Sequence, residues 1–341
     1  VLIADEAHYL KGWRSKRTNR VYGKACKGGE GSLAGESEHV WLLTGTPAPN
    51  HYGEVYPHLR ALAPHLVRHP QKGRPMTPFE FEDRYCYVQN TAFGRQVSGN
   101  KNGAELKQVL SKWALRRRKK DVLTQLPPLR VVATPLTFSS EGQQERAKAL
   151  AQVDRELRKG LGDVTPEHPE EALQALHSRQ SELSSLRRQL GVLKAADVVQ
   201  FVTGMLEGGT DKLVLFGVHH EVLDRMKSLL AGYSPVSLDG RDTARARGEA
   251  IKRFQEDPKT RVIVCQIQAA GTAVTLTAAS DVVFAEGDWT PANMLQASAR
   301  CHRIGQTQSV LAQLLYLPGT LDEAIQRVLS RKTTQLGELF M

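Results

Sequence analysis

Short, almost wholly apolar segments alternate with amphipathic helices through the second half of this chain, and this alternation constrains the fold more than any other feature. The apolar segments are KLVLFGV at 212–218, RVIVCQ at 261–266, DVVFAE at 281–286 and VLAQLLYL at 310–317. A continuous apolar run of that length predicts a strand buried on both faces, since half-buried strands alternate with polar residues. Such strands separated by helices predict a parallel α/β sheet covered on both sides.

The first half of the chain offers fewer strands. VLIA at 1–4 and HVWLLT at 39–44 are the two candidates, and the middle of the chain is helical and heavily charged. We therefore predict two α/β lobes joined by a helical insertion. The first lobe spans 1–136, the insertion 137–210 and the second lobe 211–341.

Composition limits the class of protein further. The chain has 341 residues, enough for two domains, and a formal net charge of +10, which favours a polyanionic partner. Its four cysteines show no metal-ligand spacing and indicate free thiols in a reducing compartment. The most apolar long stretch, 262–285, is too polar to span a bilayer. We expect a protein that is neither secreted nor membrane-bound. It would lie in the cytoplasm or nucleoid of a prokaryote or phage, or in a eukaryotic nucleus.

Two carboxylates, Asp5 and Glu6, directly follow the first predicted strand. Ligands of open α/β sheets bind beyond the carboxyl ends of the strands. An Asp at that place can hold Mg²⁺, and a neighbouring Glu can accept a proton from an attacking water. A strand that ends in two acids is more often a solvated turn, so the pair alone leaves both interpretations open.

Two further stretches favour the catalytic interpretation of the two acids. LLTGTPAPN at 42–50 is a strand that ends in a small, hydroxyl-rich turn. In QASARCHRIGQ at 296–306, Arg300 and Arg303 are three residues apart and share a helix face. Two guanidinium groups on one face suit the spread charge of a phosphoryl-transfer transition state, although taken alone they are more often surface charges.

Together with other stretches, these residues resemble the Swi/Snf-type DNA translocases of helicase superfamily two over nearly the whole chain. HRIGQ is the most specific element, and residues 184–202 are similar to the annealing-helicase branch and its bacterial and phage relatives. The matching stretches, in family order, are DEAH at 5–8, LTGTPAPN at 43–50, LRRRKKDVLTQLPP at 115–128, KLVLFGVHH at 212–220, the DG…R…IKRFQ pattern across 239–255, and DWTPANMLQASARCHRIGQ at 288–306.

The resemblance implies two RecA-like lobes that close on ATP and Mg²⁺ and act as a DNA-dependent ATPase. It assigns Mg²⁺ to Asp5 and the water-activating base to Glu6, and it makes His8 the link from the ATP site to the neighbouring motif. Arg300 and Arg303 would be arginine fingers that stabilise the transferred phosphoryl group.

The same resemblance assigns coupling and binding roles. Thr44, Gly45 and Thr46 would link the ATP state to the grip on DNA, and Gln296 and Gly271 would lie at the nucleotide. DNA contacts, to phosphates and independent of sequence, would come from Lys119, Lys120, His219 and Thr272. The basic run 116–120 could equally be a solvated face. Protein partners are left open.

One family motif is missing. Members carry a phosphate-binding loop, G-x-x-x-x-G-K-[ST], upstream of the DEAH box, and no such stretch occurs in these residues. GKACKGGEGS at 23–32 lies after the box and lacks the spacing. We expect that the chain is truncated at its N-terminus, inside the first lobe, and that alone it hydrolyses ATP negligibly. Ala299 and Ala270 also replace an acid and a Gly common in the family.

Two hypotheses follow. The first is an ATP-driven translocase that acts on duplex or branched DNA. The second is a catalytically inactive remnant or split subunit that binds DNA or another protein without turnover.

Overall fold

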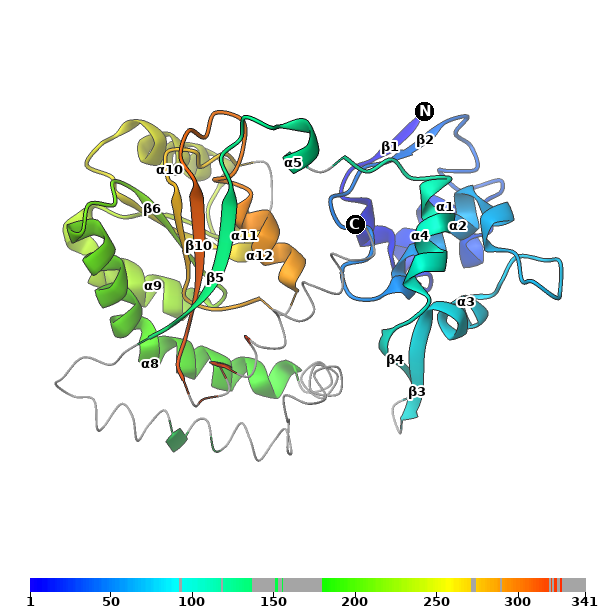
Figure 1. Cartoon of the computed structure of the whole chain (residues 1–341), viewed down its shortest axis with the longest axis horizontal. Helices are drawn as coiled ribbons and strands as arrows, with labels where there is room; N and C mark the ends of the chain where they lie inside the picture. The colour runs from blue at the N-terminus through cyan, green and yellow to red at the C-terminus, as the bar shows by residue number, and fades with distance from the viewer. Residues whose placement is uncertain are drawn as a thin grey trace. The chain divides into compact units, whose positions relative to one another are not determined.

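The chain folds into two compact units, residues 1–116 and 117–331, shown in a computed structural model (Figure 1). The two units are taken in turn. The residues that the structure describes are 1–91, 94–117, 119–136, 151–152, 155, 180–270, 274–288, 290–318, 320, 322–323 and 326.

The second unit is built on a six-stranded parallel sheet with the order β5-β10-β9-β6-β8-β7. All four predicted apolar segments are strands of this sheet, which confirms the α/β class. Its strands are β5 (Leu129–Pro135), β6 (Leu213–Gly217), β7 (Val236–Leu238), β8 (Val262–Gln266), β9 (Asp281–Phe284) and β10 (Val310–Tyr316).

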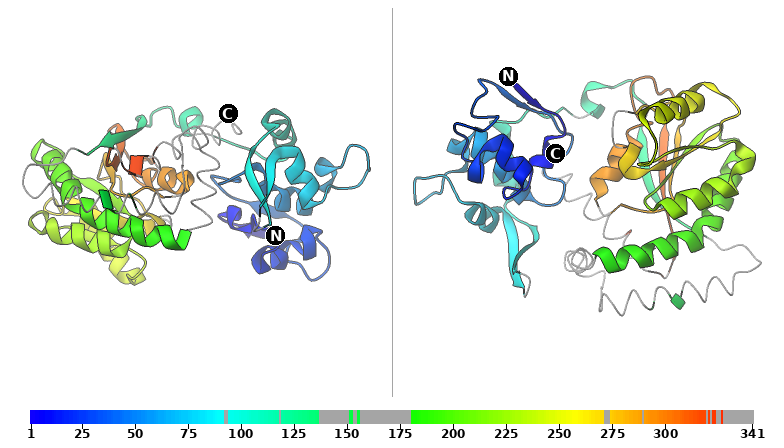
Figure 2. Two further views of the ribbon diagram at one scale, coloured as in Figure 1. Left: turned by 90° about the horizontal axis from the view of Figure 1, so that it is seen from below. Right: turned by 180° about the vertical axis from the view of Figure 1, so that it is seen from behind.

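Helices cover both faces of this sheet, as Figures 1 and 2 show. On one face α10, α11 and α12 pack over Val214 and Phe216 of β6, and on the other α8 and α9 pack over Leu213 and Leu215. The alternation follows from the two-residue period of a strand. The helices are α5 (Lys119–Val122), α8 (Gln180–Glu207), α9 (His220–Leu229), α10 (Ala244–Glu256), α11 (Ile267–Ala270) and α12 (Pro291–Ser298), with the short 3₁₀ helix η5 (Ala231–Tyr233).

The division of the structure differs from the predicted lobe boundaries. β5 pairs along its length with β10, so residues 129–135 belong to the sheet of the second unit. The carboxyl-terminal part of α8 lies in the same unit's core, with Val198 and Val202 fully buried. Of the predicted insertion, residues 137–179 lie outside the described residues, apart from 151, 152 and 155.

Helix α8 approaches α9 and the segment after β9 closely at Gly191. A Cβ at this position would lie 2.7 Å from Cγ2 of Val222 and 2.8 Å from Oε1 of Glu286. Glu286 is a buried carboxylate that accepts the backbone N–H groups of Val218 and His219 at 2.8 and 3.0 Å. Any larger side chain at residue 191 would therefore push α8 away from α9 and from the segment that follows β9.

The first unit has two small sheets and a separate helical core. β1 and β2 are parallel, and β3 and β4 form an antiparallel hairpin that projects from the helices (Figures 1 and 2). Its elements are β1 (Leu2–Ala4), β2 (Val40–Leu42), β3 (Cys86–Thr91), β4 (Gly94–Asn100), α1 (Lys16–Tyr22), α2 (Tyr56–Leu62), α3 (Pro78–Tyr85), α4 (Gly103–Ser111), and the 3₁₀ helices η1 (Ala7–Leu10), η2 (Lys24–Cys26), η3 (Tyr52–Val55) and η4 (Pro64–Val67).

The core of the first unit lies among its helices and not on its parallel strands. Leu59, Phe81 and Leu106 are fully buried between α2, α3 and α4. By contrast, Ile3 of β1 is 64% exposed and Trp41 of β2 is 63% exposed. Within the described residues, no helix is both long and apolar enough to cross a membrane.

We expect the strands of the two units to differ in stability. Amide hydrogens of β6, β8 and β9 should exchange at least about 100-fold more slowly than those of β1 and β2, roughly 3 kcal/mol of opening free energy. The reason is that the former strands are buried on both faces, whereas a two-stranded pair with exposed apolar side chains is marginal. Hydrogen exchange followed by mass spectrometry measures this difference, and equal protection of all five strands would contradict it.

Candidate functional site

The two acids lie in a strained turn between β1 and η1. The N–H of Glu6 donates to Oδ1 of Asp5 at 2.9 Å. Glu6 itself has φ 50° and ψ 45°, in the left-handed region, which costs a residue with a Cβ about 1–2 kcal/mol. Strain of this kind concentrates at functional turns, because the surrounding structure must hold it. The backbone geometry therefore sets Glu6 apart from an ordinary solvated turn.

His8 connects this turn to the one that follows β2. Its Nδ1 lies 3.2 Å from Oε2 of Glu6 and 3.1 Å from Oγ1 of Thr44. The N–H of Thr46 donates to the same Thr44 hydroxyl at 3.1 Å. Burial lowers the pKa of His8, although the Glu6 carboxylate opposes that shift. The structure thus brings four predicted site residues together around a neutral imidazole, and Gly45 lies in the same turn.

A buried carboxylate, Glu54, holds these two segments against each other. Asn50 donates to it through its backbone N–H at 2.7 Å and through Nδ2 at 2.8 Å, and Nζ of Lys11 lies 2.9 Å away. Burial alone would raise the pKa of Glu54, but His51, Lys11 and Asn50 together lower it. Glu54 therefore ties η1 to the 43–50 turn as an ionised group. Glu54 was not among the predicted site residues, although an acid four residues after Asn50 was a visible signal.

We predict that Glu54→Gln lowers the free energy of unfolding by about 2 kcal/mol. Breaking a fully buried ion pair costs about 3–5 kcal/mol, and here Lys11 keeps a side-chain exposure of 34%. Urea unfolding followed by tryptophan fluorescence measures the change, since three of the four tryptophans, Trp13, Trp41 and Trp113, lie in the first unit. Glu38→Gln, at a side chain 86% exposed, is the matched control and should change little. Equal effects of the two substitutions would refute the role of Glu54.

In the second unit the helix α12 ends at Ser298, so the prediction that Arg300 and Arg303 share a helix face is wrong. The two arginines lie on the loop that follows, residues 299–306, here called the arginine loop. Arg300 is buried, and its carbonyl accepts the N–H of Leu276 at 2.9 Å. Nη1 of Arg303 donates to Oγ1 of Thr275 at 3.3 Å. The arginine loop is therefore fastened to the 275–279 turn that precedes β9.

Gln306, at the end of HRIGQ, provides most of this fastening and was not among the predicted site residues. Its side chain is buried. Nε2 donates to three backbone carbonyls and Oε1 accepts two backbone N–H groups. The carbonyls are those of Thr277, Ala279 and Cys301 at 3.2, 2.9 and 3.3 Å, and the N–H groups those of Thr307 and Gln308, both at 2.9 Å.

Gln306→Glu should destabilise the second unit by about 3 kcal/mol, or roughly 10 °C in Tm, because a carboxylate cannot donate to the three carbonyls that face it. Gln308→Glu is the control, since it makes the same chemical change at an exposed neighbour. Thermal unfolding followed by circular dichroism compares them. A Tm for Gln306→Glu as high as that of the control would show that the amide is not needed.

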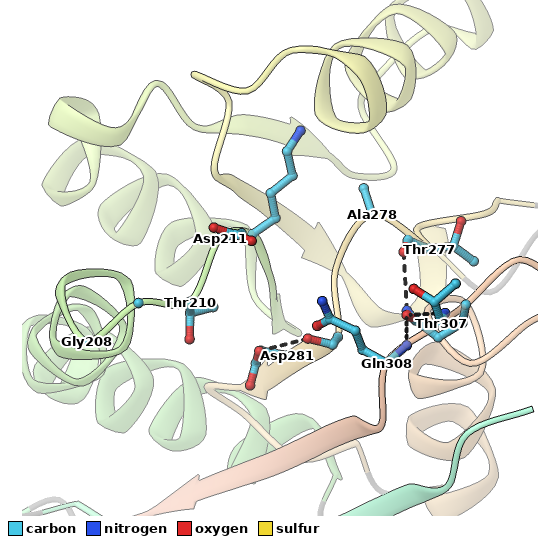
Figure 3. Close-up of a pocket in the computed structure, with 12 residues that line it drawn as sticks. Gly208, Thr210, Asp211, Thr277, Ala278, Asp281, Thr307 and Gln308 are labelled. Atoms are coloured by element: carbon cyan, nitrogen blue, oxygen red, sulfur yellow. Dashed lines mark hydrogen bonds between the residues drawn. The ribbon is translucent and has the colours of Figure 1, made fainter.

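A polar pocket of about 480 Å³ lies beside Gln306, at the amino ends of β6, β9 and β10 (Figure 3). Asp211 and Asp281 contribute carboxylates to its wall, and burial raises the pKa of Asp281. The remaining lining consists of small residues such as Gly208, Thr210 and Ala278, together with the longer side chains of Lys212, Gln306 and Gln308. The predicted site residues do not line this pocket, so it is separate from the site proposed below.

The predicted DNA contacts are dispersed. Nδ1 of His219 lies 2.6 Å from Oε1 of Glu286 and its side chain is only 14% exposed, so it packs inside the unit. Nζ of Lys119 donates to the carbonyl of His302 at 2.8 Å. The side chain of Lys120, and all of Gly271 and Thr272, lie outside what the structure describes. Gln296 is half-buried on α12.

Two protein families match this chain. Residues 194–305 match the helicase conserved C-terminal domain, which covers most of the second unit. Residues 1–176, just over half of the 341, match the SNF2-related domain, and the chain belongs to the SNF2 family. The predicted resemblance is confirmed, and the six-stranded parallel sheet of the second unit confirms the α/β class.

Individual relatives match nearly the whole chain. The DNA annealing helicase and endonuclease ZRANB3 of Bos taurus is 32% identical over 99% of this chain. The SWI/SNF-related matrix-associated actin-dependent regulator of chromatin subfamily A-like protein 1 of Xenopus tropicalis is also 32% identical over 99%. This chain spans only 29% and 33% of the lengths of these two relatives.

Solved structures of the same kind are more distant. The Sulfolobus solfataricus SWI2/SNF2 ATPase core in complex with dsDNA is 23% identical, with a TM-score of 0.45, over 99% of this chain and 68% of that one. The C-terminal part of the Fun30 ATPase domain is 14% identical, with a TM-score of 0.45, over 63% of this chain and 97% of that one.

Proposed function

We propose that this chain forms part of an ATP-dependent translocase that moves along duplex or branched DNA through contacts to the phosphate backbone. The observation that carries the proposal is the connection of Glu6, through His8, to Thr44. It joins a candidate base to a turn that can respond to a change at the nucleotide. Membership of the SNF2 family and the net charge of +10 support the same function.

Asp5 suits Mg²⁺ that is bound together with a nucleotide. Mg²⁺ is usually held by one or two carboxylates plus substrate phosphates and waters, and not by an all-protein cage. Asp5 offers an exposed carboxylate of which one oxygen accepts the Glu6 N–H. Among the described residues there is no group of three His, Cys, Asp or Glu that would form such a cage. When bound, Mg²⁺ would neutralise phosphate charge.

Glu6 would take the proton of the attacking water, and His8 would keep its carboxylate in place. A neutral His8 does not compete with that water as a source of protons, and its Nδ1 is shared between Glu6 and Thr44. Arg300 and Arg303 would stabilise charge that spreads over the transferred phosphoryl group, a role that guanidinium groups fill well. Burial of Arg300 and the fastening of the arginine loop by Gln306 would keep that loop in one arrangement.

The test is DNA-stimulated ATP hydrolysis in two forms of the protein. Residues 1–341 contain no phosphate-binding loop, so this form should hydrolyse ATP at background rate. A form extended at its amino end by a strand–loop–helix unit that supplies the loop should be stimulated by duplex or forked DNA. In that form Glu6→Gln should reduce turnover by roughly 10²–10⁴-fold and leave DNA affinity unchanged, because the base acts only in the chemical step.

Glu30→Gln, at an exposed residue of the same unit, is the matched control and should keep full turnover. If the extended form binds DNA but never hydrolyses ATP, a binding module without turnover replaces the translocase. If Glu6→Gln turns over normally, another residue is the base.

A further inference from the structure

The segment that opens the second unit is held against the arginine loop by the backbone carbonyl and by the side chain of His302. The carbonyl of His302 accepts a hydrogen bond from Nζ of Lys119 at 2.8 Å. Its Nε2 donates to the carbonyl of Pro127 at 2.7 Å. The carbonyl of the next residue, Pro128, accepts the N–H of Val310 where β10 begins. The position of the Lys119 side chain is therefore set by the same loop that carries the arginines.

Lys119 is thereby held at the loop that carries two further cations, Arg300 and Arg303. The pKa of Lys119 is lowered, first by the protein that surrounds part of its side chain and then by the positive charges of Arg303 and Arg300. Among the residues that the structure describes, Lys119 and Arg303 form no ion pair with a carboxylate. Like charges that approach one another repel unless an anion lies among them.

The ammonium group of Lys119 has capacity left for such an anion. It carries three N–H donors, and the His302 carbonyl takes one of them. Lysine acts as a compact point charge toward phosphate, whereas arginine presents a planar fork of donors. Lys119 and the arginine loop thus bring both kinds of phosphate-binding group together.

We propose that Lys119 is a phosphate-binding residue that acts together with Arg300 and Arg303, and that the site they form takes a polyphosphate group. The proposal rests on the function proposed above, and it replaces the sequence-based prediction that Lys119 belongs to a separate DNA-binding run. The phosphates have two conceivable sources, the nucleotide and the DNA backbone. A connected chain of several charges matches three neighbouring cations better than isolated backbone phosphates do.

The experiment measures binding of inorganic tripolyphosphate to the 1–341 chain by calorimetry, and in parallel binding of a short duplex DNA by fluorescence anisotropy. Lys119→Gln should weaken tripolyphosphate binding about tenfold, or 1.4 kcal/mol, and Lys119→Arg should retain most of it. The matched control is Lys252→Gln on α10, a lysine 73% exposed and 3.9 Å from Glu256, which should change the affinity less than twofold. Circular dichroism shows that each variant is folded.

The outcomes separate the inference from the function on which it rests. If Arg303→Gln weakens tripolyphosphate binding and Lys119→Gln does not, the role of Lys119 is overturned while the arginine assignment stands. If Lys119→Gln weakens only duplex DNA binding, the polyphosphate site is overturned and the sequence-based DNA assignment returns. Failure of the proposed function is seen elsewhere, as absence of DNA-stimulated hydrolysis in the extended form, whatever the tripolyphosphate affinities.

Discussion

Burial of β6, β8 and β9 on both faces is the constraint on which the second unit depends. Because alternate residues of β6 serve two cores, the strand cannot shift by one residue without moving Val214 and Phe216 into the wrong layer. That fixed register determines where each loop leaves the sheet. The arginine loop and the 275–279 turn meet because α12 returns the chain from the carboxyl end of β9 to the amino end of β10, where Gln306 closes the contact.

The polar groups of both units follow one pattern. A buried side chain with more than one partner joins two loops that are distant in sequence, as Glu54 does in the first unit and Gln306 and Glu286 do in the second. Backbone groups satisfy all of the contacts of Gln306 and most of those of Glu286, whereas Glu54 is satisfied mainly by the side chains of Asn50 and Lys11. Such partners are how a buried polar side chain avoids the cost of desolvation. The residues proposed for chemistry are held by these contacts and not by the apolar cores themselves. Their geometry is therefore sensitive to substitutions that do not touch ATP or DNA.

The features that could be predicted from the sequence are those that depend on a local pattern of residues. Strands such as 212–218 were identified because they are continuously apolar, and the arginines and acids because of motif spacing. β5 was missed because LRVVATP is an edge strand with Val131 exposed, so it lacks the apolar continuity of the others. The resemblance assigned His219 to DNA, and its contact with Glu286, 67 positions away, has no local signal in the sequence. The first-unit core was not visible either, since it is built from isolated aromatic and aliphatic residues, many of them on short helices.

The pairing of β5 with β10 has a consequence for how the chain is made. Thr134 and Gln313 meet across this pair although 179 positions separate them. On a ribosome that adds about 5–20 residues per second, β5 waits roughly 10–40 s for its neighbour. During that interval its backbone is an open strand edge that other chains can join. Synthesis of β10 thus gives β5 its partner and covers the strand edge that other chains could join.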